Sequence, residues 1–153
     1  MKVLDVMQKE VAVVDELSSV ADAAKALLTL SEDIVIVCTR GKPIGVVTGH
    51  DIQSYLGMGK NTRIPVSRIM SSPIVSISPY ADAEEALHHM DAQKLRKYPV
   101  ILGGRLMGVV SLQSIVEKKN AHIRFHRSIQ NLVLVLFVAF EIGIFVLSAR
   151  GSP

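Results

Sequence analysis

Two residues at the end of a short β-branched run could hold a polar ligand. Thr48 and Asp51 stand three residues apart, directly after Val46 and Val47. A hydroxyl residue in that place is a natural helix N-cap, and an acid at the third helical position can accept from the free amides. The free amides and the positive end of the helix dipole also favour a polar ligand. A carboxylate there can accept both hydroxyl hydrogens of a ribose, while the neighbouring hydroxyl holds a ribose or phosphate oxygen.

A second copy of this turn lies 63 residues further along the chain, from Gly45 to Gly108. Ser111 stands where the first copy has Thr48, and Ser114 stands where it has Asp51. Because Ser114 cannot act as a carboxylate, the turn at Thr48 and Asp51 is the better candidate for a ribose site.

The duplication extends through most of the chain at this constant offset, so the chain contains two copies of one unit. We expect repeat 1 at residues 1–60 and repeat 2 at residues 61–118. A lone unit of that size buries too little surface, so we expect the two repeats to share a core. Further matched pairs are Met7 with Met70, Val11 with Ile74, Val20 with Ala83, Ala23 with Ala86 and Leu27 with Met90.

Each repeat is predicted to fold as β-α-β-β-α, which gives a mixed α/β (α+β) protein. The β-branched run at 34–38 indicates a buried strand, and the glycine turns at 40–43 and 103–105 predict hairpins. Ser18 or Ser19 can cap the first helix. The predicted strands are 11–14, 34–38, 44–47, 74–77, 98–102 and 106–110, and the predicted helices are 20–28, 51–56, 82–90 and 112–118.

Together these features resemble a tandem pair of CBS domains, the Bateman module, over about residues 3–118. The resemblance implies two units related by a pseudo-twofold axis, with their strand faces together. It also implies two clefts that in many relatives bind AMP, ADP, ATP or S-adenosylmethionine, and association into disc-like homodimers. It rests on the lead-ins Asp5-Val6-Met7 and Arg68-Ile69-Met70, the segment Leu95-Arg96-Lys97-Tyr98-Pro99-Val100, and the two Gly-Val-Val-Thr/Ser turns.

The resemblance further implies that cations for a phosphate come from the start of the central strand. Arg96 and Lys97 stand there in repeat 2 and could reach a ligand held by Asp51. Repeat 1 has Asp33 and Ile34 at the equivalent places, and an acid repels phosphate. The sequence therefore does not predict two equal polyphosphate sites. It leaves AMP, an uncharged or cationic adenosyl compound, or no ligand.

Each of these residues also has a structural interpretation. Asp51 could be only half of a capping box, and Arg96 and Lys97 could be solvated charges at a strand edge. Cys38 ends an apolar run and is predicted to be a small core residue. The predicted ligand-binding residues are Val11, Ile34, Thr48, Asp51, Arg96, Lys97 and Ser111.

We predict no catalytic constellation, no metal site and no required cofactor. Cys38 has no His/Asp partner at a recognisable spacing, and His122 and His126 lack an evident third ligand. The net charge of +3 is mild. The basic residues between 118 and 127 are too few, and too poor in interleaved aromatics, to favour nucleic-acid binding.

The sequence after about residue 118 is unlike the repeats. Residues 132–147 contain a single charge, at Glu141. Extended to residues 129–149, the run would span about 31 Å as a helix, the thickness of a bilayer core. The apolar sum can outweigh the cost of Glu141. The basic residues just before this run place the repeats in the cytoplasm by the positive-inside rule. We therefore predict a third segment, 119–153, that anchors the chain at the cytoplasmic face of the cell membrane.

Two alternatives to the anchor remain open. The protein could be soluble in the cytoplasm, with the apolar helix buried in an oligomer, because a helix that is apolar all round must be buried in lipid or protein. Less favoured, the run could form two strands. Met1 to Glu10 contains no apolar stretch typical of a signal peptide, and a single cysteine, which rules out an internal disulfide, suggests a reducing compartment.

The sequence thus predicts a non-enzymatic regulatory module. It would sense an adenosyl ligand in the cleft at Thr48 and Asp51 and signal to a partner, at a membrane or through a membrane protein. The alternative is a ligand-free CBS scaffold for homo-oligomerisation.

Overall fold

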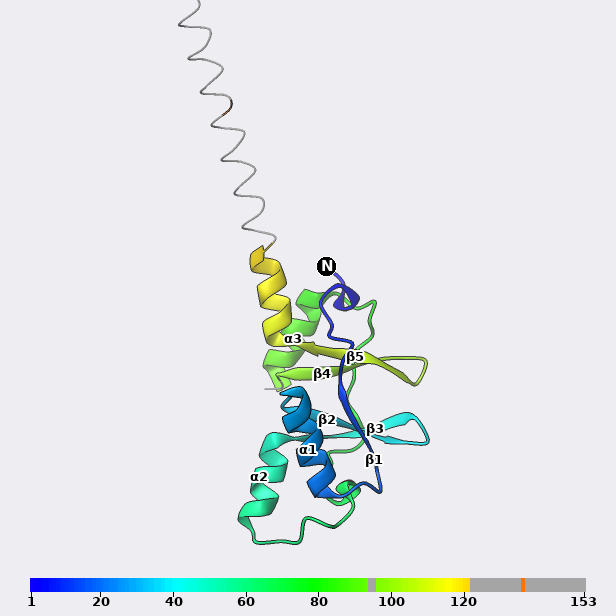
Figure 1. Cartoon of the computed structure of the whole chain (residues 1–153). Helices are drawn as coiled ribbons and strands as arrows, with labels where there is room; N and C mark the ends of the chain where they lie inside the picture. Colours follow the sequence, from blue (N-terminus) through cyan, green and yellow to red (C-terminus); the bar gives the residue numbers. More distant parts are fainter. Residues whose placement is uncertain (94–95, 122–135, 137–153) are drawn as a thin grey trace, which may run out of the picture. The chain divides into compact units, whose positions relative to one another are not determined.

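The computed structural model describes residues 1–93, 96–121 and Leu136. The chain divides into two units, Met1–Ile115 and Val116–Pro153. The first unit contains repeat 1, residues 61–115 of repeat 2 and every labelled helix and strand described below (Figure 1). Of the second unit, 116–121 and Leu136 are helical. The predicted apolar helix at 129–149 otherwise lies outside the described residues, and among those that are described no helix is both long and apolar enough to span a bilayer.

Repeat 1 is a three-stranded sheet with two helices packed on it (Figure 1). Strand β1 runs parallel to β2, and β2 runs antiparallel to β3. Val35, Val37 and Val47 make one face of the sheet apolar, and the helices cover this face and bury these residues fully. The elements are β1 (Ala12–Asp15), α1 (Val20–Leu30), β2 (Ile34–Thr39), β3 (Lys42–Thr48) and α2 (Gly49–Gly57), in the predicted order.

Helix α1 begins and ends at residues suited to those places. Of the two predicted caps, Ser19 is the one used: its Oγ accepts a hydrogen bond from the Asp22 amide at 3.1 Å, and the Asp22 carboxylate accepts from the Ser19 amide at 3.0 Å. Ser31 ends the helix in the left-handed region, with φ of 53°. The chain can therefore turn directly into β2.

Repeat 2 has a two-stranded sheet, so the strand predicted at 74–77 is wrong. Of residues 74–77, only Ile77 pairs with the sheet: its amide donates to the Pro99 carbonyl, and its carbonyl accepts from the Ile101 amide. The next hydrogen bond of a parallel ladder would need an amide at residue 99, and Pro99 has none. The elements are α3 (Ala83–Gln93), β4 (Lys97–Leu102) and β5 (Arg105–Ser111), and residues 112–121 are helical.

Both hairpins close with two residues of positive φ. Arg40 and Gly41 have φ of 49° and 78°, and Gly103 and Gly104 have φ of 56° and 76°. This pair of left-handed residues is typical of the type I′ turn, whose twist matches that of the flanking strands. The predicted hairpins are confirmed.

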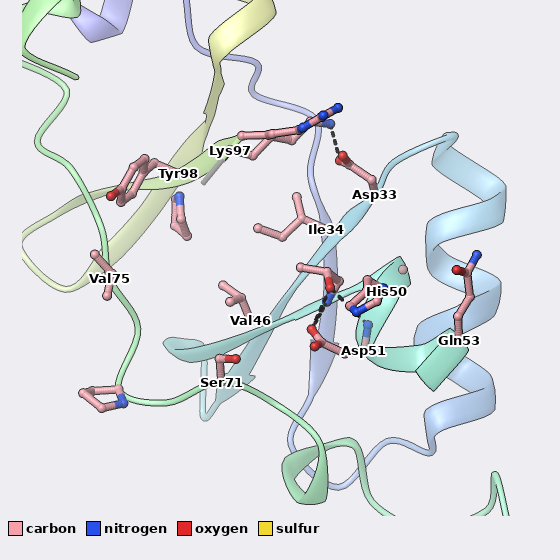
Figure 2. Close-up of a pocket in the computed structure, with 15 residues that line it drawn as sticks. Asp33, Ile34, Val46, His50, Asp51, Gln53, Ser71, Val75, Lys97 and Tyr98 are labelled. Carbon is pink, nitrogen blue, oxygen red and sulfur yellow. Dashed lines mark hydrogen bonds and ion pairs between the residues drawn. The ribbon is translucent and has the colours of Figure 1, made fainter. Parts of the chain in front are cut away.

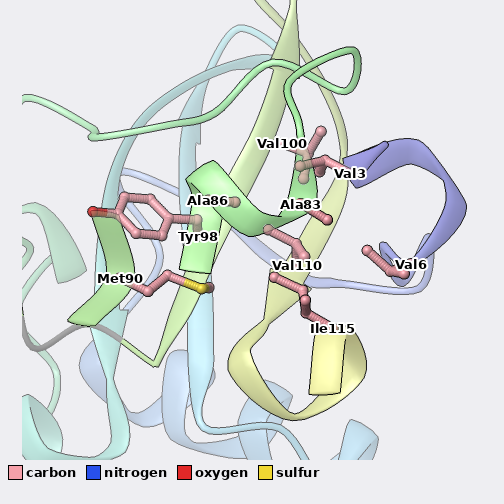
Figure 3. Packing of buried hydrophobic residues seen from close by; sticks show 9 residues of the cluster. All are labelled: Val3, Val6, Ala83, Ala86, Met90, Tyr98, Val100, Val110 and Ile115. Carbon is pink, nitrogen blue, oxygen red and sulfur yellow. The ribbon is translucent and has the colours of Figure 1, made fainter. Parts of the chain in front are cut away.

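The lead-in of each repeat packs on the other repeat. The short helix η1 (Val3–Asp5) buries Val3 in the core of repeat 2, beside Val100 and Val110 (Figure 3). The short helix η2 (Val66–Arg68) buries Val66 in the core of repeat 1. The Val66 amide donates to the Ser18 carbonyl at 2.7 Å. Each repeat therefore completes its core with a segment that belongs, by sequence, to its twin.

Two glycines allow these lead-ins to cross the sheets at close range. Gln8 forms two backbone hydrogen bonds with Val109, and a Cβ at Gly108 would overlap the Gln8 carbonyl oxygen. Ser71 is bonded in the same way to Val46, and a Cβ at Gly45 would lie 2.8 Å from the Ser71 oxygen. The first residue of each Gly-Val-Val run is thus needed for the crossing.

A small apolar cluster joins the repeats, as the predicted shared core requires. Ile34, Ile36 and Cys38 of β2 pack there with Val109 of β5. Each of the four is less than one-tenth exposed. Partly buried members of both repeats surround them: Val11, Val46, Ile74 and Leu106.

We predict that Gly108→Ala destabilises the protein by about 1 to 3 kcal/mol, because the new methyl group would push against backbone rather than a flexible side chain. Denaturant unfolding monitored by circular dichroism measures the change. Gly57→Ala is the matched control, since a Cβ at Gly57 meets nothing within 4 Å. Equal stability of the two variants would show that the crossing tolerates a side chain.

Candidate ligand-binding cleft

A cleft of about 680 Å³ is formed by residues of both repeats (Figure 2). Its volume is typical of small-molecule sites. Repeat 1 contributes the start of β2, the end of β3 and the first turn of α2, and the segment around residues 71–75 and the start of β4 supply the rest. The lining residues are Asp33, Ile34, Val46, Thr48, Gly49, His50, Asp51, Gln53, Ser71, Pro73, Val75, Arg96, Lys97, Tyr98 and Pro99.

Thr48 and Asp51 form the capping box of α2 and also line this cleft. One carboxylate oxygen of Asp51, Oδ2, accepts from the Thr48 amide at 2.8 Å and from the Thr48 hydroxyl at 2.7 Å. The Asp51 amide donates back to Thr48 Oγ1 at 3.2 Å. The second oxygen, Oδ1, accepts no hydrogen bond from the described part of the chain. The cap therefore fixes the carboxylate and leaves one oxygen for a ligand.

The matching turn of repeat 2 is capped by two serines. Ser114 donates its amide to Ser111 Oγ at 3.0 Å, and the Ser111 amide donates to Ser114 Oγ at 3.2 Å. Ser111 is only 8% exposed, and neither serine lines the cleft described above. The serine turn thus reproduces the cap without supplying a carboxylate.

Lys97 lies in the cleft but is already paired with two acids. Its Nζ is 2.5 Å from Glu32 Oε2 and 2.7 Å from Asp33 Oδ1, and Figure 2 shows the Asp33 contact. Burial lowers the pKa of Lys97, but the hydrogen bonds and charges of Asp33 and Glu32 outweigh burial and raise that pKa above its usual value. Lys97 is therefore a fully charged lysine whose charge is balanced within the protein.

Arg96 has a different environment on the same strand. It lines the cleft and is exposed, and its guanidinium forms no ion pair with any described residue. An incoming anion could therefore bind Arg96 without displacing a carboxylate, whereas at Lys97 it would have to compete with Glu32 and Asp33.

The apolar wall of the cleft includes Ile34, as expected, together with Val46 and Tyr98 (Figure 2). Val11 is not on this wall, because it packs in the apolar cluster between the repeats. The structure therefore brings together five of the seven predicted residues, Ile34, Thr48, Asp51, Arg96 and Lys97, and leaves out Val11 and Ser111.

Several lining residues were not predicted. Ser71, Pro73 and Val75 reach the cleft because the lead-in of repeat 2 crosses β3 at Gly45. The only sequence signal for this crossing is the glycine itself. The cap at Thr48 could have indicated His50 and Gln53, since they lie in the helical turn that it begins.

Cys38 is a buried free thiol, which confirms its prediction as a core residue. Burial, and then the charge of Asp15, raise the pKa of this thiol. A thiol with a raised pKa is a poor nucleophile. Across residues 1–93 and 96–121, no group of three or more His, Cys, Asp or Glu side chains is placed to hold a metal ion.

This arrangement is a pair of mixed α/β repeats that share one cleft. The CBS domain family model matches residues 3–57 and 66–120, so the chain belongs to the CBS domain family. CBS pairs are generally regulatory, non-catalytic modules.

Curated relatives share moderate sequence identity with the chain. It is 29% identical to the CBS domain-containing protein YhcV of Bacillus subtilis over 111 residues, which cover 72% of this chain and 79% of that protein. It is 31% identical over 87 residues to the protein MK0525 of Methanopyrus kandleri, covering 55% of this chain. The match covers 44% of MK0525, so the chain spans less than half of that relative.

Solved structures share the fold. The CBS domain pair of protein MJ0100, in complex with 5′-methylthioadenosine and S-adenosyl-L-methionine, has a TM-score of 0.72 at 19% identity, covering 80% of this chain and 98% of that one. The CBS domain protein PAE2072 of Pyrobaculum aerophilum, complexed with AMP, has a TM-score of 0.70 at 19% identity, covering 74% and 89%. A hexameric CBS-CP12 protein from bloom-forming cyanobacteria has a TM-score of 0.68 at 28% identity, covering 76% and 69%.

We predict that Lys97→Met lowers the free energy of unfolding by about 1 to 3 kcal/mol at neutral pH, because Glu32 and Asp33 lose their cation. The raised pKa of Lys97 means that its contribution is present in full below the ordinary lysine value of 10.5 and is lost as the pH rises through the folded-state value. The difference between wild type and variant should therefore shrink above about pH 10.5.

Denaturant unfolding at several pH values up to 12 tests this pH dependence, with Lys42→Met as the control at an exposed lysine without an ion pair. A difference that stays constant to pH 12 would contradict the assigned ion pairs.

Proposed function

We propose that the chain is a regulatory module that binds an adenosine-containing ligand in the cleft between its repeats. The observation that carries this proposal is the Asp51 carboxylate. Its Oδ2 is held by Thr48, and its Oδ1 is left for a hydroxyl at the edge of a cleft of about 680 Å³. A fixed carboxylate at a helix start suits the two hydroxyl groups of a ribose.

The rest of the cleft fits the remaining parts of such a ligand. Ile34, Val46 and Tyr98 supply an apolar wall against which an adenine could pack. The positive end of the α2 helix dipole and the Arg96 guanidinium could meet a polar or singly anionic group beyond the ribose. Two structures with this fold, those of MJ0100 and PAE2072, hold adenosine compounds, which supports the choice of ligand class.

Ligand binding would act as a signal because the cleft has walls from both repeats. A molecule that contacts both Asp51 and Tyr98 favours one mutual position of the two repeats, and a partner that recognises that position would respond to the ligand. We place the partner surface in a homodimer or larger assembly. The hexameric cyanobacterial CBS-CP12 protein, at 28% identity, supports assembly as a property of such chains.

Residues 129–149 would tether the module to the cytoplasmic face of a membrane or to a membrane protein. The support for this is their apolar sequence and the basic residues that precede them.

A second candidate function is a scaffold that assembles without a ligand. The completed capping box favours the scaffold, because capping α2 is a structural role for Asp51 that needs no bound ligand. The two functions differ in one measurable property, the binding of an adenosine compound by the isolated protein.

We predict that isothermal titration detects binding of 5′-methylthioadenosine or AMP to the full chain, and that Asp51→Asn weakens it about tenfold to a hundredfold, since a charged acceptor for the ribose is lost. Asp22→Asn is the matched control: Asp22 completes the same kind of capping box with Ser19 in α1 but does not line the cleft. The control variant should lose helix-cap stability and keep its affinity.

No heat with adenosine, 5′-methylthioadenosine, S-adenosylmethionine, AMP or ATP would instead support the scaffold. Equal weakening by Asp51→Asn and Asp22→Asn would show that Asp51 acts only through the fold.

We predict that the full chain sediments with membranes and is released by detergent, whereas a chain ending at residue 127 stays soluble. Fractionation of cells that express each form measures this. A full chain that remains in the soluble fraction without detergent would contradict the tether and favour burial of the apolar segment in an oligomer.

A further inference from the structure

The charges around the cleft do not suit a polyphosphate. Asp33 and Asp51 line it, and Lys97, one of its two strong cations, is shared between Glu32 and Asp33. Arg96 alone among the described lining arginines and lysines has no carboxylate partner. An anion entering the cleft therefore meets one uncompensated cation beside two acids.

The pairing of Lys97 is built into the fold rather than being a chance surface contact. Only 20% of the Lys97 side chain and 16% of the Glu32 side chain are exposed. The turn that carries the acids is fixed at both ends: the Glu32 amide donates to the Leu27 carbonyl at 2.9 Å, and the Asp33 carbonyl accepts from the Gly49 amide at 3.0 Å. The second of these bonds holds Asp33 beside the first turn of α2, next to the ribose position proposed above.

We infer that Glu32 and Asp33 make the cleft selective for adenosine ligands whose 5′ substituent is uncharged or cationic, a thioether or a sulfonium, over those with a phosphate chain. This inference rests on the proposed function and specifies its ligand class.

The selectivity follows from the cost of the two ways to accommodate a phosphate chain. If the phosphates take Lys97, the largely buried Glu32 carboxylate loses its partner. If Lys97 stays where it is, the phosphates lie near Asp33 with only Arg96 to balance them, and like charges at a few ångströms repel. A sulfonium has neither cost, and the acidic edge of the cleft attracts it.

The first part of the test is a titration of the wild-type chain with 5′-methylthioadenosine, S-adenosylmethionine, AMP and ATP. These four share an adenosine and differ in the charge at the 5′ position. We expect affinity to fall as negative charge is added, with ATP at least about tenfold weaker than 5′-methylthioadenosine.

The second part changes the charges. In the double variant Glu32→Gln/Asp33→Asn, Lys97 is released, and the affinity for ATP relative to 5′-methylthioadenosine should rise about tenfold or more. In Lys97→Met the two acids have no cation. The affinity for S-adenosylmethionine relative to 5′-methylthioadenosine should therefore rise, and the relative affinity for ATP should fall further. The control Glu10→Gln/Glu85→Gln removes the same two charges at exposed positions outside the cleft and should leave both ratios unchanged.

The two proposals fail in different ways. If none of the four compounds binds the wild-type chain, the proposed function is overturned. If they bind but ATP equals or exceeds 5′-methylthioadenosine, the selectivity inference alone is overturned. It is also overturned if both cleft variants keep the wild-type ratios, or if the Glu10/Glu85 control shifts them as far. Each ratio compares two ligands on the same variant. A variant that is merely less stable would bind both ligands more weakly and would leave the ratio unchanged.

Discussion

The exchange of lead-ins between the repeats is the constraint on which the rest of the structure depends. At Gly108 and at Gly45 one backbone crosses another so closely that a Cβ has no room. These crossings put Val3 and Val66 into the core of the opposite repeat. The crossing at Gly45 also brings Ser71 and Pro73 to the cleft. The crossings at Gly108 and Gly45 therefore complete the two cores, and the crossing at Gly45 also positions one wall of the candidate site.

Within the cleft, the proposed function gives the same atoms a part in stability and in recognition. The hydrogen bonds that begin α2 also orient the Asp51 carboxylate, so an acceptor for the proposed ribose would be fixed without a further loss of side-chain entropy. The cation at Lys97 is likewise committed to Glu32 and Asp33 before any ligand arrives. The charged groups that remain for a ligand are those without a partner in the protein, namely Asp51 Oδ1 and the Arg96 guanidinium.

Local features of the fold were predictable from the sequence because they depend on neighbouring residues. The caps at Ser19 and Thr48, the two glycine hairpins and the burial of Cys38 all follow from short-range pattern and residue type. Long-range contacts were not predictable. Pro99 interrupts a pairing with Ile77, and Glu32 meets Lys97 across 65 residues, and neither partner is evident from a local pattern. The sequence therefore predicted that Asp51 and Arg96 share a cleft and that Asp33 is unfavourable for phosphate, but it did not predict that Lys97 is paired with Glu32 and Asp33.

The exchanged lead-ins also constrain the order in which a growing chain can fold. Residues 1–8 leave the ribosome long before β5, yet Gln8 is hydrogen-bonded to Val109. Until β5 has been synthesised, Val3 has no core to enter, and repeat 1 can complete its own core only once Val66 has emerged. Closing so wide a loop is slow compared with forming a helix or a hairpin. During synthesis the segment 1–8 therefore lacks its partner in the core of repeat 2 until almost all of the first unit has been made.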